Sequence, residues 1–385
     1  MEIYLDNSAT TVVADSVREI MIKTMTEDFG NPSSLHMKGV EAEKYLRTAR
    51  DEIAGILKVQ PKEIIFTSGG TESNNLAIIG TATANARAGK HIITTAIEHA
   101  SVLNTMHHME ELGFSVTYLP VDKHGKITAK QVFDALTEDT ILVSVMHVNN
   151  EVGAVEPVEE IGEMLHKERP EILFHVDGIQ SFGKYQIRPK KYHIDLFSVS
   201  GHKIHGPKGS GFLYVSDRVK IKPILFGGGQ QRGLRSGTDN VPGIAGIGEA
   251  AALMYRNFDE NTAHMYELKD KLIDGLGKIS GTVVHSERGR DSAPHIVNVS
   301  FIGVRSEVML HTLEAKGIYV SSGSACSSNH PHISETLSGM GLSRDEIDSA
   351  IRFSLCEKTT GEEIDYALEI IGENIETLRK FTRRK

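Results

Sequence analysis

Lys203 is the residue of this sequence best suited to carbonyl chemistry. It lies in residues 198–209, a segment rich in glycine, histidine and turn-forming residues. Residues 194–199 before it and 211–215 after it have the length and β-branched content of buried strands, so we expect Lys203 in a loop between two strands. A lysine becomes a nucleophile when burial or a neighbouring cation lowers its pKa, and His202 is adjacent. If this loop is considered without the rest of the chain, an ordinary exposed lysine is the alternative to a nucleophilic one, because most lysines are exposed.

Cys326 is the second residue with a candidate chemical role. It lies in residues 321–330, a stretch dominated by serine, glycine and alanine, which predicts an accessible and mobile thiol. The sequence has 2 cysteines, and the other, Cys356, follows an apolar run that it is expected to end. Two cysteines cannot form a disulfide framework or a cysteine-only metal site. A reactive thiol is therefore the special role that remains for Cys326.

Arg352 is an anomaly within an apolar run, residues 351–355, that has the character of a strand. A strand arginine is costly to bury unless it pairs with a carboxylate. Taken alone, this position favours a structural salt bridge.

A glycine-containing loop at residues 68–75 predicts an anion site. It follows an expected strand, residues 63–67, and precedes a helical pattern, so Gly70 and Thr71 stand where a helix begins. Glycine lets the backbone approach an anion, and the first N–H groups of a helix point toward it. The loop is neither a Walker loop nor a dinucleotide fingerprint, and an ordinary capped helix is an equally weighted alternative.

These residues require a scaffold that brings distant segments together, and the chain has one. Short apolar strands alternate with amphipathic helices, which predicts an α/β fold with a largely parallel sheet covered on both faces. Ligand groups gather at the carboxyl ends of such strands. Five expected strands end in polar residues, at Gly70-Thr71, Glu98-His99, Asn149 to Glu151, Asp177 to Gln180 and Ser200 to Lys203.

After about residue 270 the pattern shifts to short strands, expected at Thr282 to His285, His295 to Phe301 and Ile318 to Ser321, with helices between and after them. This pattern indicates a second α+β domain. We expect a large domain at residues 14–256 and a small domain formed by residues 1–13 and 257–385. A basic, glycine-rich loop at residues 227–238 is expected to close over phosphate or a neighbouring subunit, with a flexible surface loop as the alternative.

The composition is that of a globular protein, and it excludes several functions. The chain has 385 residues, 39% of them hydrophobic and 24% charged, and a net charge of -9. This charge argues against direct binding of nucleic acid, because neutralising phosphates requires a basic surface. No apolar stretch approaches the length of a membrane span, and residues 1–10 lack the core of a signal peptide. We therefore expect a cytoplasmic protein that does not bind membranes.

Taken together, these segments resemble the cysteine desulfurases of the NifS/IscS type. These are pyridoxal phosphate enzymes of the class V aminotransferase family with the aspartate-aminotransferase fold. The resemblance covers nearly the whole chain and rests on many ordered matches. The matching segments are residues 4–11, 30–34, 67–75, 147–151, 175–177, 200–203, 232–238, 322–326 and 351–355. It implies fold type I, with a large domain built on a mostly parallel sheet of seven strands and a smaller α+β domain.

The resemblance also implies a role for each residue of the cofactor site. Lys203 would hold pyridoxal phosphate as a Schiff base, Asp177 would pair with the pyridine nitrogen, and His99 would stack on the ring. The remaining cofactor contacts would come from Gly70, Thr71, Asn150, Gln180, Ser200 and His202, with Thr238 supplied by the second subunit of a homodimer.

The implied activity is removal of sulfur from L-cysteine to give L-alanine and a persulfide on Cys326. Asn150 and Arg352 would hold the substrate carboxylate, whereas Lys203 and His99 would move protons. The persulfide would be passed to an acceptor protein, such as an iron-sulfur scaffold or a tRNA-thiolation enzyme. Through that persulfide Cys326 would be a transient metal ligand of an iron-sulfur cluster. Many members have glycine at the position of Cys356, so the resemblance assigns that residue no role.

Four other functions are compatible with parts of the sequence. A selenocysteine lyase or an aminotransferase would keep the fold and cofactor, and Cys326 argues against transamination because that reaction needs no thiol. A metal-binding or metal-delivery protein could use Cys326, His330 and His332, but no fourth ligand lies at a fixed spacing. An inactive scaffold is disfavoured because Lys203, Asp177, His99 and Cys326 are all present.

Overall fold

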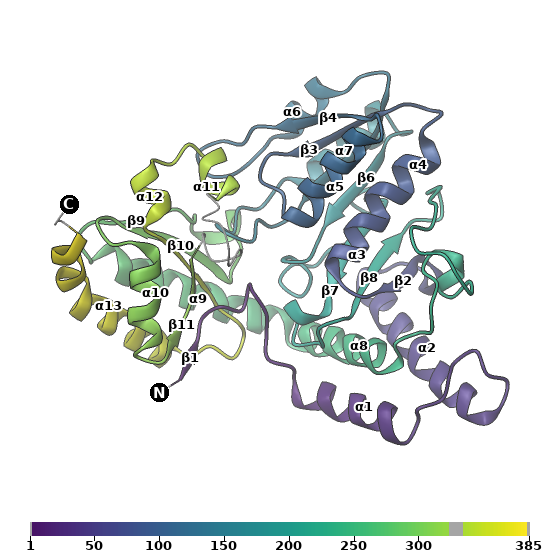
Figure 1. Ribbon diagram of the computed structural model, residues 1–385, viewed down its shortest axis with the longest axis horizontal. Helices are drawn as coiled ribbons and strands as arrows, with labels where there is room; N and C mark the ends of the chain where they lie inside the picture. The colour runs from purple at the N-terminus through teal and green to yellow at the C-terminus, as the bar shows by residue number, and fades with distance from the viewer. Residues whose placement is uncertain (1, 323–333, 383–385) are drawn as a thin grey trace.

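The computed structural model describes residues 2–322 and 334–382, which form two lobes (Figure 1). The strands are β1 Ile3–Tyr4, β2 Ile64–Thr67, β3 His91–Thr95, β4 Ser115–Leu119, β5 Thr140–Met146, β6 Leu173–Asp177, β7 Leu196–Ser200, β8 Gly211–Val215, β9 Thr282–Val284, β10 Ile296–Phe301, β11 Ile318–Tyr319, β12 Ser321–Ser322 and β13 Ala350–Ser354.

The longer helices cover these strands, and several short helical turns link them. The α-helices are α1 Asp15–Thr26, α2 Met37–Leu57, α3 Gly70–Asn75, α4 Thr81–Asn85, α5 Ala100–Glu111, α6 Ala129–Ala135, α7 Val158–Glu168, α8 Val241–Arg256, α9 Phe258–Gly277, α10 Ser306–Glu314, α11 Glu335–Gly339, α12 Arg344–Asp348 and α13 Gly361–Thr382. A π-helical turn, η2 Leu76–Gly80, joins α3 to α4. The short helical turns η1 Pro61–Glu63, η3 Gly201–Lys203, η4 Gln231–Gly233 and η5 Gly289–Asp291 complete the described elements.

The large lobe is built on a seven-stranded sheet with the order β2-β8-β7-β6-β5-β3-β4. Strands β3 to β7 pair in parallel, and β8 is antiparallel to both of its neighbours, β7 and β2. Because β2 is antiparallel to β8, it runs in the same direction as β7. The sequence prediction of a mostly parallel sheet of seven strands is therefore confirmed. The five polar segments all follow the carboxyl ends of strands that run in the same direction, so they lie on the same side of the sheet.

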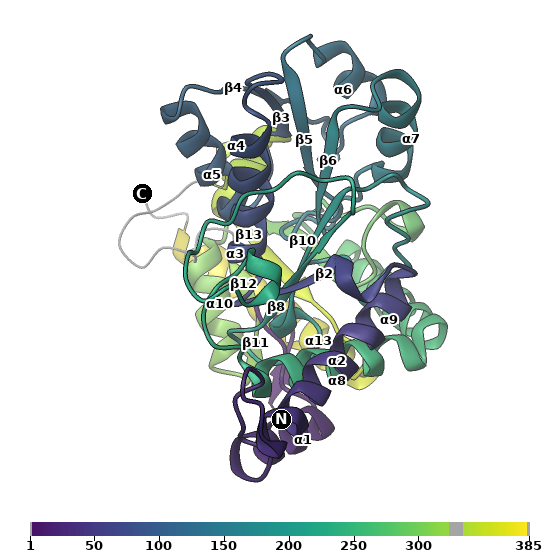
Figure 2. The same ribbon diagram turned by 90° about the vertical axis from the view of Figure 1, so that its right-hand side faces the viewer.

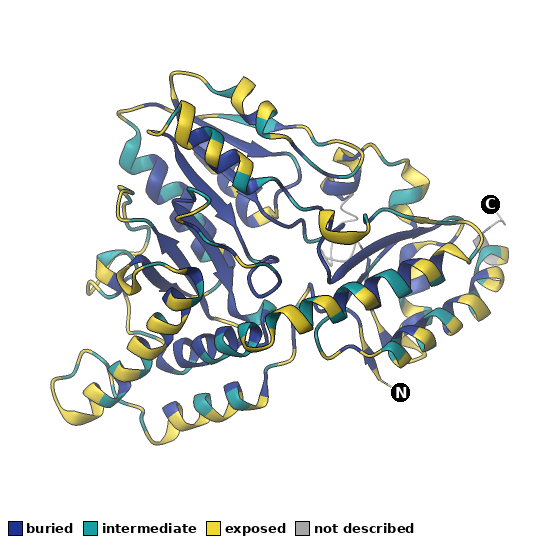
Figure 3. Ribbon diagram, turned by 180° about the vertical axis from the view of Figure 1, so that it is seen from behind, coloured by how far each residue is buried: buried dark blue, intermediate teal, exposed yellow. Residues whose placement is uncertain are grey.

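Helices cover both faces of this sheet (Figure 2). The α2 residues that face the core recur at helical spacing, among them Leu46, Ala49, Ile53 and Leu57, and they pack with α8 and the strands. On the other face α5 contributes Val102, Met106 and Met109 to a second cluster. The strands of this sheet are buried except for β4 at its edge, whereas the helices keep an exposed face (Figure 3).

The smaller lobe has a four-stranded antiparallel sheet, β12-β13-β10-β9, and a two-stranded parallel pair, β1-β11. Helices α9, α10 and α13 pack on it around a separate core that includes Val299, Phe301, Phe353 and Ile371. The amino-terminal strand β1 belongs to this lobe, and the chain then crosses to α1 in the larger one (Figure 1). The domain boundaries expected at residues 13/14 and 256/257 stay a prediction.

One expected strand differs in the structure. The run from Ile318 to Ser321 was predicted as a single strand, but it is divided at Val320 into β11 and β12. The two parts pair with different partners, β1 and β13, so the chain changes sheets at this point. Among the described residues, no helix is long and apolar enough to cross a membrane.

Candidate active site

Lys203 ends η3, the short helical turn that follows β7. Its ammonium group donates hydrogen bonds to the main-chain carbonyls of Ser8 and Ala9, the latter at 2.8 Å. The amino-terminal segment therefore folds over the lysine, which is half-buried and not the solvated surface residue of the alternative interpretation. The expectation that His202 is a neighbouring cation is wrong, because burial and nearby lysines lower the pKa of His202 to about 4.

Asp177 lies at the end of β6 and is buried. Its Oδ2 accepts a hydrogen bond from Asn74 Nδ2 at 2.7 Å, and its Oδ1 accepts one from the Ile179 amide at 3.0 Å. Burial raises the pKa of Asp177, while the two hydrogen bonds and the charges of His99 and Lys203 act in the opposite direction. This buried carboxylate is ready to receive a positively charged N–H group from a ligand.

His99 is the N-cap of α5, and its protonation is determined by its neighbours. Its Nδ1 accepts a hydrogen bond from the Ser101 amide at 3.1 Å, so neutral His99 carries its proton on Nε2. Ser101 Oγ lies 2.9 Å from the same nitrogen and 2.9 Å from Asn74 Nδ2. Asn74 therefore connects His99, through Ser101, to Asp177. Surrounding protein atoms desolvate the imidazole of His99 and lower its pKa, so its neutral form persists below pH 6.5. The residue nevertheless keeps an exposed surface at the carboxyl ends of the strands.

The expected phosphate cradle is assembled from three strand ends. A Cβ built on Gly70 would lie 2.1 Å from Ile179 Cδ1 and 3.5 Å from Ser200 Cβ, so the loops after β2, β6 and β7 meet here. Only glycine fits at position 70 without displacing Ile179. Gly70 begins α3, and His202 Nδ1 lies 3.3 Å from Thr10 Oγ1. Thr71 and Thr238 are both exposed, and Thr238 belongs to the glycine-rich loop.

Gln180 is buried behind the lysine loop. Its Nε2 donates a hydrogen bond to the Ser8 carbonyl at 3.0 Å, which is also an acceptor for Lys203. Its Oε1 lies 3.2 Å from His295 Nε2, and burial holds the pKa of His295 well below its usual value. Neutral His295 donates to Gln180, and this interaction orients the amide.

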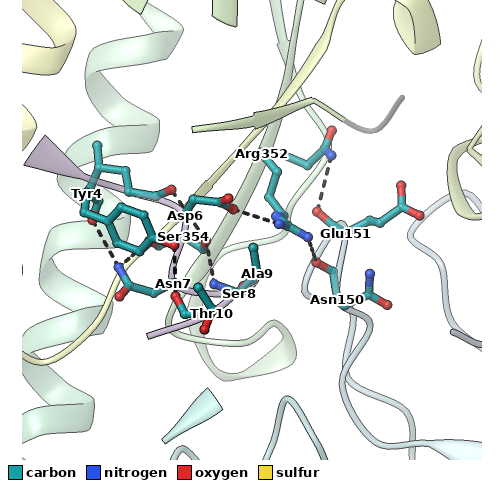
Figure 4. A network of polar contacts seen from close by, with 12 residues as sticks. Tyr4, Asp6, Asn7, Ser8, Ala9, Thr10, Asn150, Glu151, Arg352 and Ser354 are labelled. Atoms are coloured by element: carbon teal, nitrogen blue, oxygen red, sulfur yellow. Dashed lines mark hydrogen bonds and ion pairs between the residues drawn. The ribbon is translucent and has the colours of Figure 1, made fainter. Parts of the chain in front are cut away.

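Arg352, in the middle of β13, lies between the two lobes (Figure 4). Its Nη2 forms an ion pair with Asp6 Oδ1 at 2.8 Å, and its Nη1 donates to the Asn150 carbonyl at 2.8 Å. The salt bridge predicted from the position of this arginine in a strand is therefore present. The Nε of Arg352 is buried and has no hydrogen-bond partner among the described residues. The guanidinium has five N–H groups, so Nη1 and Nη2 each keep a second N–H that can bind a carboxylate.

The structure thus brings Lys203, Asp177, His99, Gly70, Ser200, Gln180 and Arg352 toward the same edge of the large sheet. Cys326, His330 and His332 lie outside the described residues. A cavity of about 860 Å³ lies nearby, lined by Lys184 and Tyr185 among others, but none of the predicted cofactor residues lines it.

Sequence reasoning missed three supporting residues. Asn74 holds Asp177, Ser8 offers its carbonyl to two site residues, and Asp6 pairs with Arg352. Asn74 lies inside the glycine-containing loop at residues 68–75, and Asp6 and Ser8 lie in the amino-terminal segment at residues 4–11. Their polar character in those segments was the signal, but no partner could be assigned from it.

Comparison with known proteins identifies the family of this chain. The sequence model of the aminotransferase class-V family matches residues 3–367. The chain belongs to that family. It is 45% identical to the cysteine desulfurase IscS of Methanosarcina thermophila over 99% of this chain and 93% of the relative.

Two solved structures carry the same fold. A NifS-like protein superposes with a TM-score of 0.93 at 41% identity, covering 98% of this chain and 100% of that protein. SspA in complex with cysteine superposes with a TM-score of 0.81 at 36% identity, covering 94% of this chain and 100% of that protein. The predicted fold type I is confirmed. The chain is a pyridoxal phosphate-dependent cysteine desulfurase, as the sequence resemblance implied.

Proposed function

We propose that this cysteine desulfurase transfers the sulfur of L-cysteine to Cys326, with Lys203, His99, Asp177 and Arg352 as the residues that make the transfer possible. The observation that supports these assignments best is that the residues after β2, β3 and β6 are joined by hydrogen bonds, and that Arg352 binds the loop after β5. The residues present fit pyridoxal phosphate, because the buried Asp177 can receive its protonated ring nitrogen and the Gly70 backbone leaves space that a side chain would fill.

Each residue has a separate task in this proposal. Arg352 binds the substrate carboxylate through the planar guanidinium that Asp6 already orients. Lys203 Nζ, the covalent attachment point of the cofactor, also removes the proton from the substrate α-carbon. His99, protonated on Nε2 when neutral, donates and accepts protons during the reaction. The cofactor, when bound, supplies an electron sink that stabilises negative charge at the α-carbon.

The sulfur transfer is balanced without an external oxidant. The Cys326 thiolate attacks the substrate sulfur, an S–S bond forms and the Cβ–S bond breaks, with its electron pair left on carbon. Protonation of that carbon gives alanine, and Cys326 retains one extra sulfur. We further propose that acceptor proteins take this sulfur for iron-sulfur cluster assembly or tRNA thiolation, in which case Cys326 is a transient ligand of the cluster. The relative named IscS supports this assignment, and a cytoplasmic location stays a prediction.

We also infer that the enzyme acts as a homodimer, in which Thr238 of one subunit reaches the phosphate of the other. Exposed apolar side chains support this inference, since Leu35 is 101% exposed and Phe226, near the start of the Thr238 loop, is 81% exposed. Sedimentation should give a dimer that the substitution Phe226→Glu dissociates. Val308→Glu, at an exposed apolar residue of α10, is the matched control and should stay dimeric. A monomeric parent enzyme would exclude the shared site.

Deuterium exchange separates the tasks of Lys203 and Cys326. In deuterated buffer, Cys326→Ala should exchange the α-hydrogen of L-cysteine but form no alanine, because proton removal precedes the attack by the thiolate. Lys203→Ala should do neither. If Cys326→Ala formed alanine at the parent rate, or if Lys203→Ala exchanged at that rate, the corresponding assignment would be wrong.

A further inference from the structure

A group of potential metal ligands lies beside the active site and has no task in the proposed reaction. The ligand atoms of His205, Cys356 and Glu357 all lie within 4.8 Å of one another. His205 is buried and follows Lys203 by two residues, whereas Cys356 and Glu357 are half-buried and follow the end of β13. The group therefore connects the lysine loop of the large lobe with the strand that carries Arg352.

The histidine of this group is oriented as a metal ligand usually is. His205 Nδ1 lies 2.8 Å from the Val12 carbonyl, which can only accept, so Nδ1 carries a proton. The second nitrogen, Nε2, then faces Glu357 Oε2 at 3.2 Å. A carbonyl that fixes the tautomer and ring orientation is a common outer-shell partner of a ligating histidine.

The backbone of His205 is also held in a strained conformation. Its φ of 62° lies in the left-handed region, which costs energy for a residue other than glycine. The His205 amide donates a hydrogen bond to Thr11 Oγ1 at 2.7 Å, and this contact helps to fix the conformation. In this conformation the imidazole contacts Glu357, which follows β13.

The sulfur of Cys356 acts as an acceptor. Thr359 Oγ1 donates to Cys356 Sγ at 3.8 Å and accepts from the Cys356 amide at 3.0 Å. The sulfur therefore faces a polar group, and cysteine binds metal through sulfur. A half-buried position also leaves a path by which an ion can enter.

We propose that His205 Nε2, Cys356 Sγ and one carboxylate oxygen of Glu357 bind a zinc ion, with water as the fourth ligand. One nitrogen, one sulfur and one oxygen are donors that zinc accepts in tetrahedral sites. Two ligands at about 2.0–2.1 Å in a tetrahedron lie roughly 3.3 Å apart, and the observed separation of His205 Nε2 and Glu357 Oε2 is 3.2 Å. The proton between these two atoms leaves when the ion binds. A thiolate and a carboxylate neutralise the two positive charges of zinc.

Lys184 competes with the ion for the negative charge of Glu357. It is buried, its Nζ donates to the Lys203 carbonyl at 2.7 Å, and its charge interacts with Glu357. Zinc would therefore bind more weakly here than at a site without a neighbouring cation. When bound, it would link the loop of Lys203 to the end of β13, and so hold Lys203 and Arg352 at a constant separation.

The test uses the cofactor-loaded Cys326→Ala variant, in which Cys356 is the only thiol of the chain. Equilibrium dialysis with ZnCl₂ should give one zinc ion per chain that is lost, or bound at least tenfold more weakly, after the further substitution Cys356→Ser. Zinc should also slow the modification of Cys356 by a thiol-specific disulfide reagent at least tenfold. The same protection should be lost in Glu357→Gln and retained in Glu362→Gln, which changes an exposed carboxylate nearby.

Equal zinc affinity with and without the Cys356 thiol would overturn the proposal, as would modification of Cys356 at the same rate with and without zinc. Serine is nearly the size of cysteine, so Cys356→Ser preserves the fold, and an unchanged thermal midpoint checks this. The result is independent of the desulfurase assignments, because the Cys326→Ala background lacks the proposed sulfur acceptor.

Discussion

Arg352 and Asp6, 346 residues apart in the sequence, form an ion pair of 2.8 Å between Nη2 and Oδ1. Arg352 also donates to the carbonyl of Asn150, so its guanidinium is held from both lobes (Figure 4). The arginine is therefore oriented before any substrate carboxylate arrives. Preorganisation of this kind reduces the entropy that binding must overcome.

Replacing Arg352 with lysine should weaken substrate binding far more than cofactor binding. Lysine keeps the positive charge but loses the planar pair of donors that matches a carboxylate. We expect the KM for L-cysteine to rise about tenfold, which corresponds to about 1.4 kcal/mol, with the same pyridoxal phosphate content. Steady-state kinetics and the cofactor absorbance check this, and Arg344→Lys, on exposed α12, should leave both unchanged. An unaltered KM would remove Arg352 from the substrate site.

The carboxylate of Asp177 should matter through its charge. Asp177→Asn keeps the size of the side chain but cannot stabilise a protonated ring nitrogen. We expect kcat to fall at least 100-fold, on the order of general acid-base effects, while the variant still binds some cofactor. Alanine formation and the cofactor spectrum measure the two effects separately. Activity within a few-fold of the parent enzyme would contradict the role of Asp177.

The acid limb of the kcat profile should report His99. Since burial lowers the pKa of this imidazole, its neutral form should be lost only as the pH falls below 6.5. Above that pH the limb should be flat. His99→Gln should lower kcat at least tenfold. It should also remove the part of the decrease of kcat at low pH that results from protonation of His99. A parent limb centred above pH 6.5, or the same limb in His99→Gln, would show that another group controls the rate.

The buried His147 should make the fold less stable in acid. Burial lowers its pKa to about 4 in the folded protein, against 6.5 in the unfolded chain. Between these two values the unfolded chain binds one more proton, so the free energy of unfolding decreases as the pH falls, by about 1.4 kcal/mol per pH unit. His147→Gln should reduce the slope by that amount in urea unfolding at pH 4 to 6.5. The exposed control His107→Gln should not change it, and an unchanged slope in His147→Gln would contradict the assignment.

Local signals were sufficient to predict most of the large sheet. Residues 211–215 were expected as a strand from their apolar and β-branched content, and β8 has those bounds. The strand ends that carry Asp177, His99 and Lys203 were predicted in the same way. A short run of apolar residues can be recognised from adjacent positions in the sequence alone, and such a run is enough to predict a buried strand.

The contacts that complete the site depend on distant residues. Ala9 accepts a hydrogen bond from Lys203 across 194 positions, and Asp6 pairs with Arg352 across 346 positions. No periodicity specifies such pairs, because they result from the path of the amino-terminal segment. The neutral state of His202 was missed for a related reason, since burial depends on the packing of several segments.

Mass spectrometry of the Cys326 peptide tests directly whether sulfur is transferred to this thiol. The purified enzyme, loaded with pyridoxal phosphate, is incubated with L-cysteine in the absence of reductant, and released alanine is measured in parallel. We predict one added sulfur on Cys326, one alanine per persulfide formed, and neither product in Cys326→Ser. Cys326 that remains unmodified in cofactor-loaded enzyme, or sulfur found on Cys356 instead, would contradict the account.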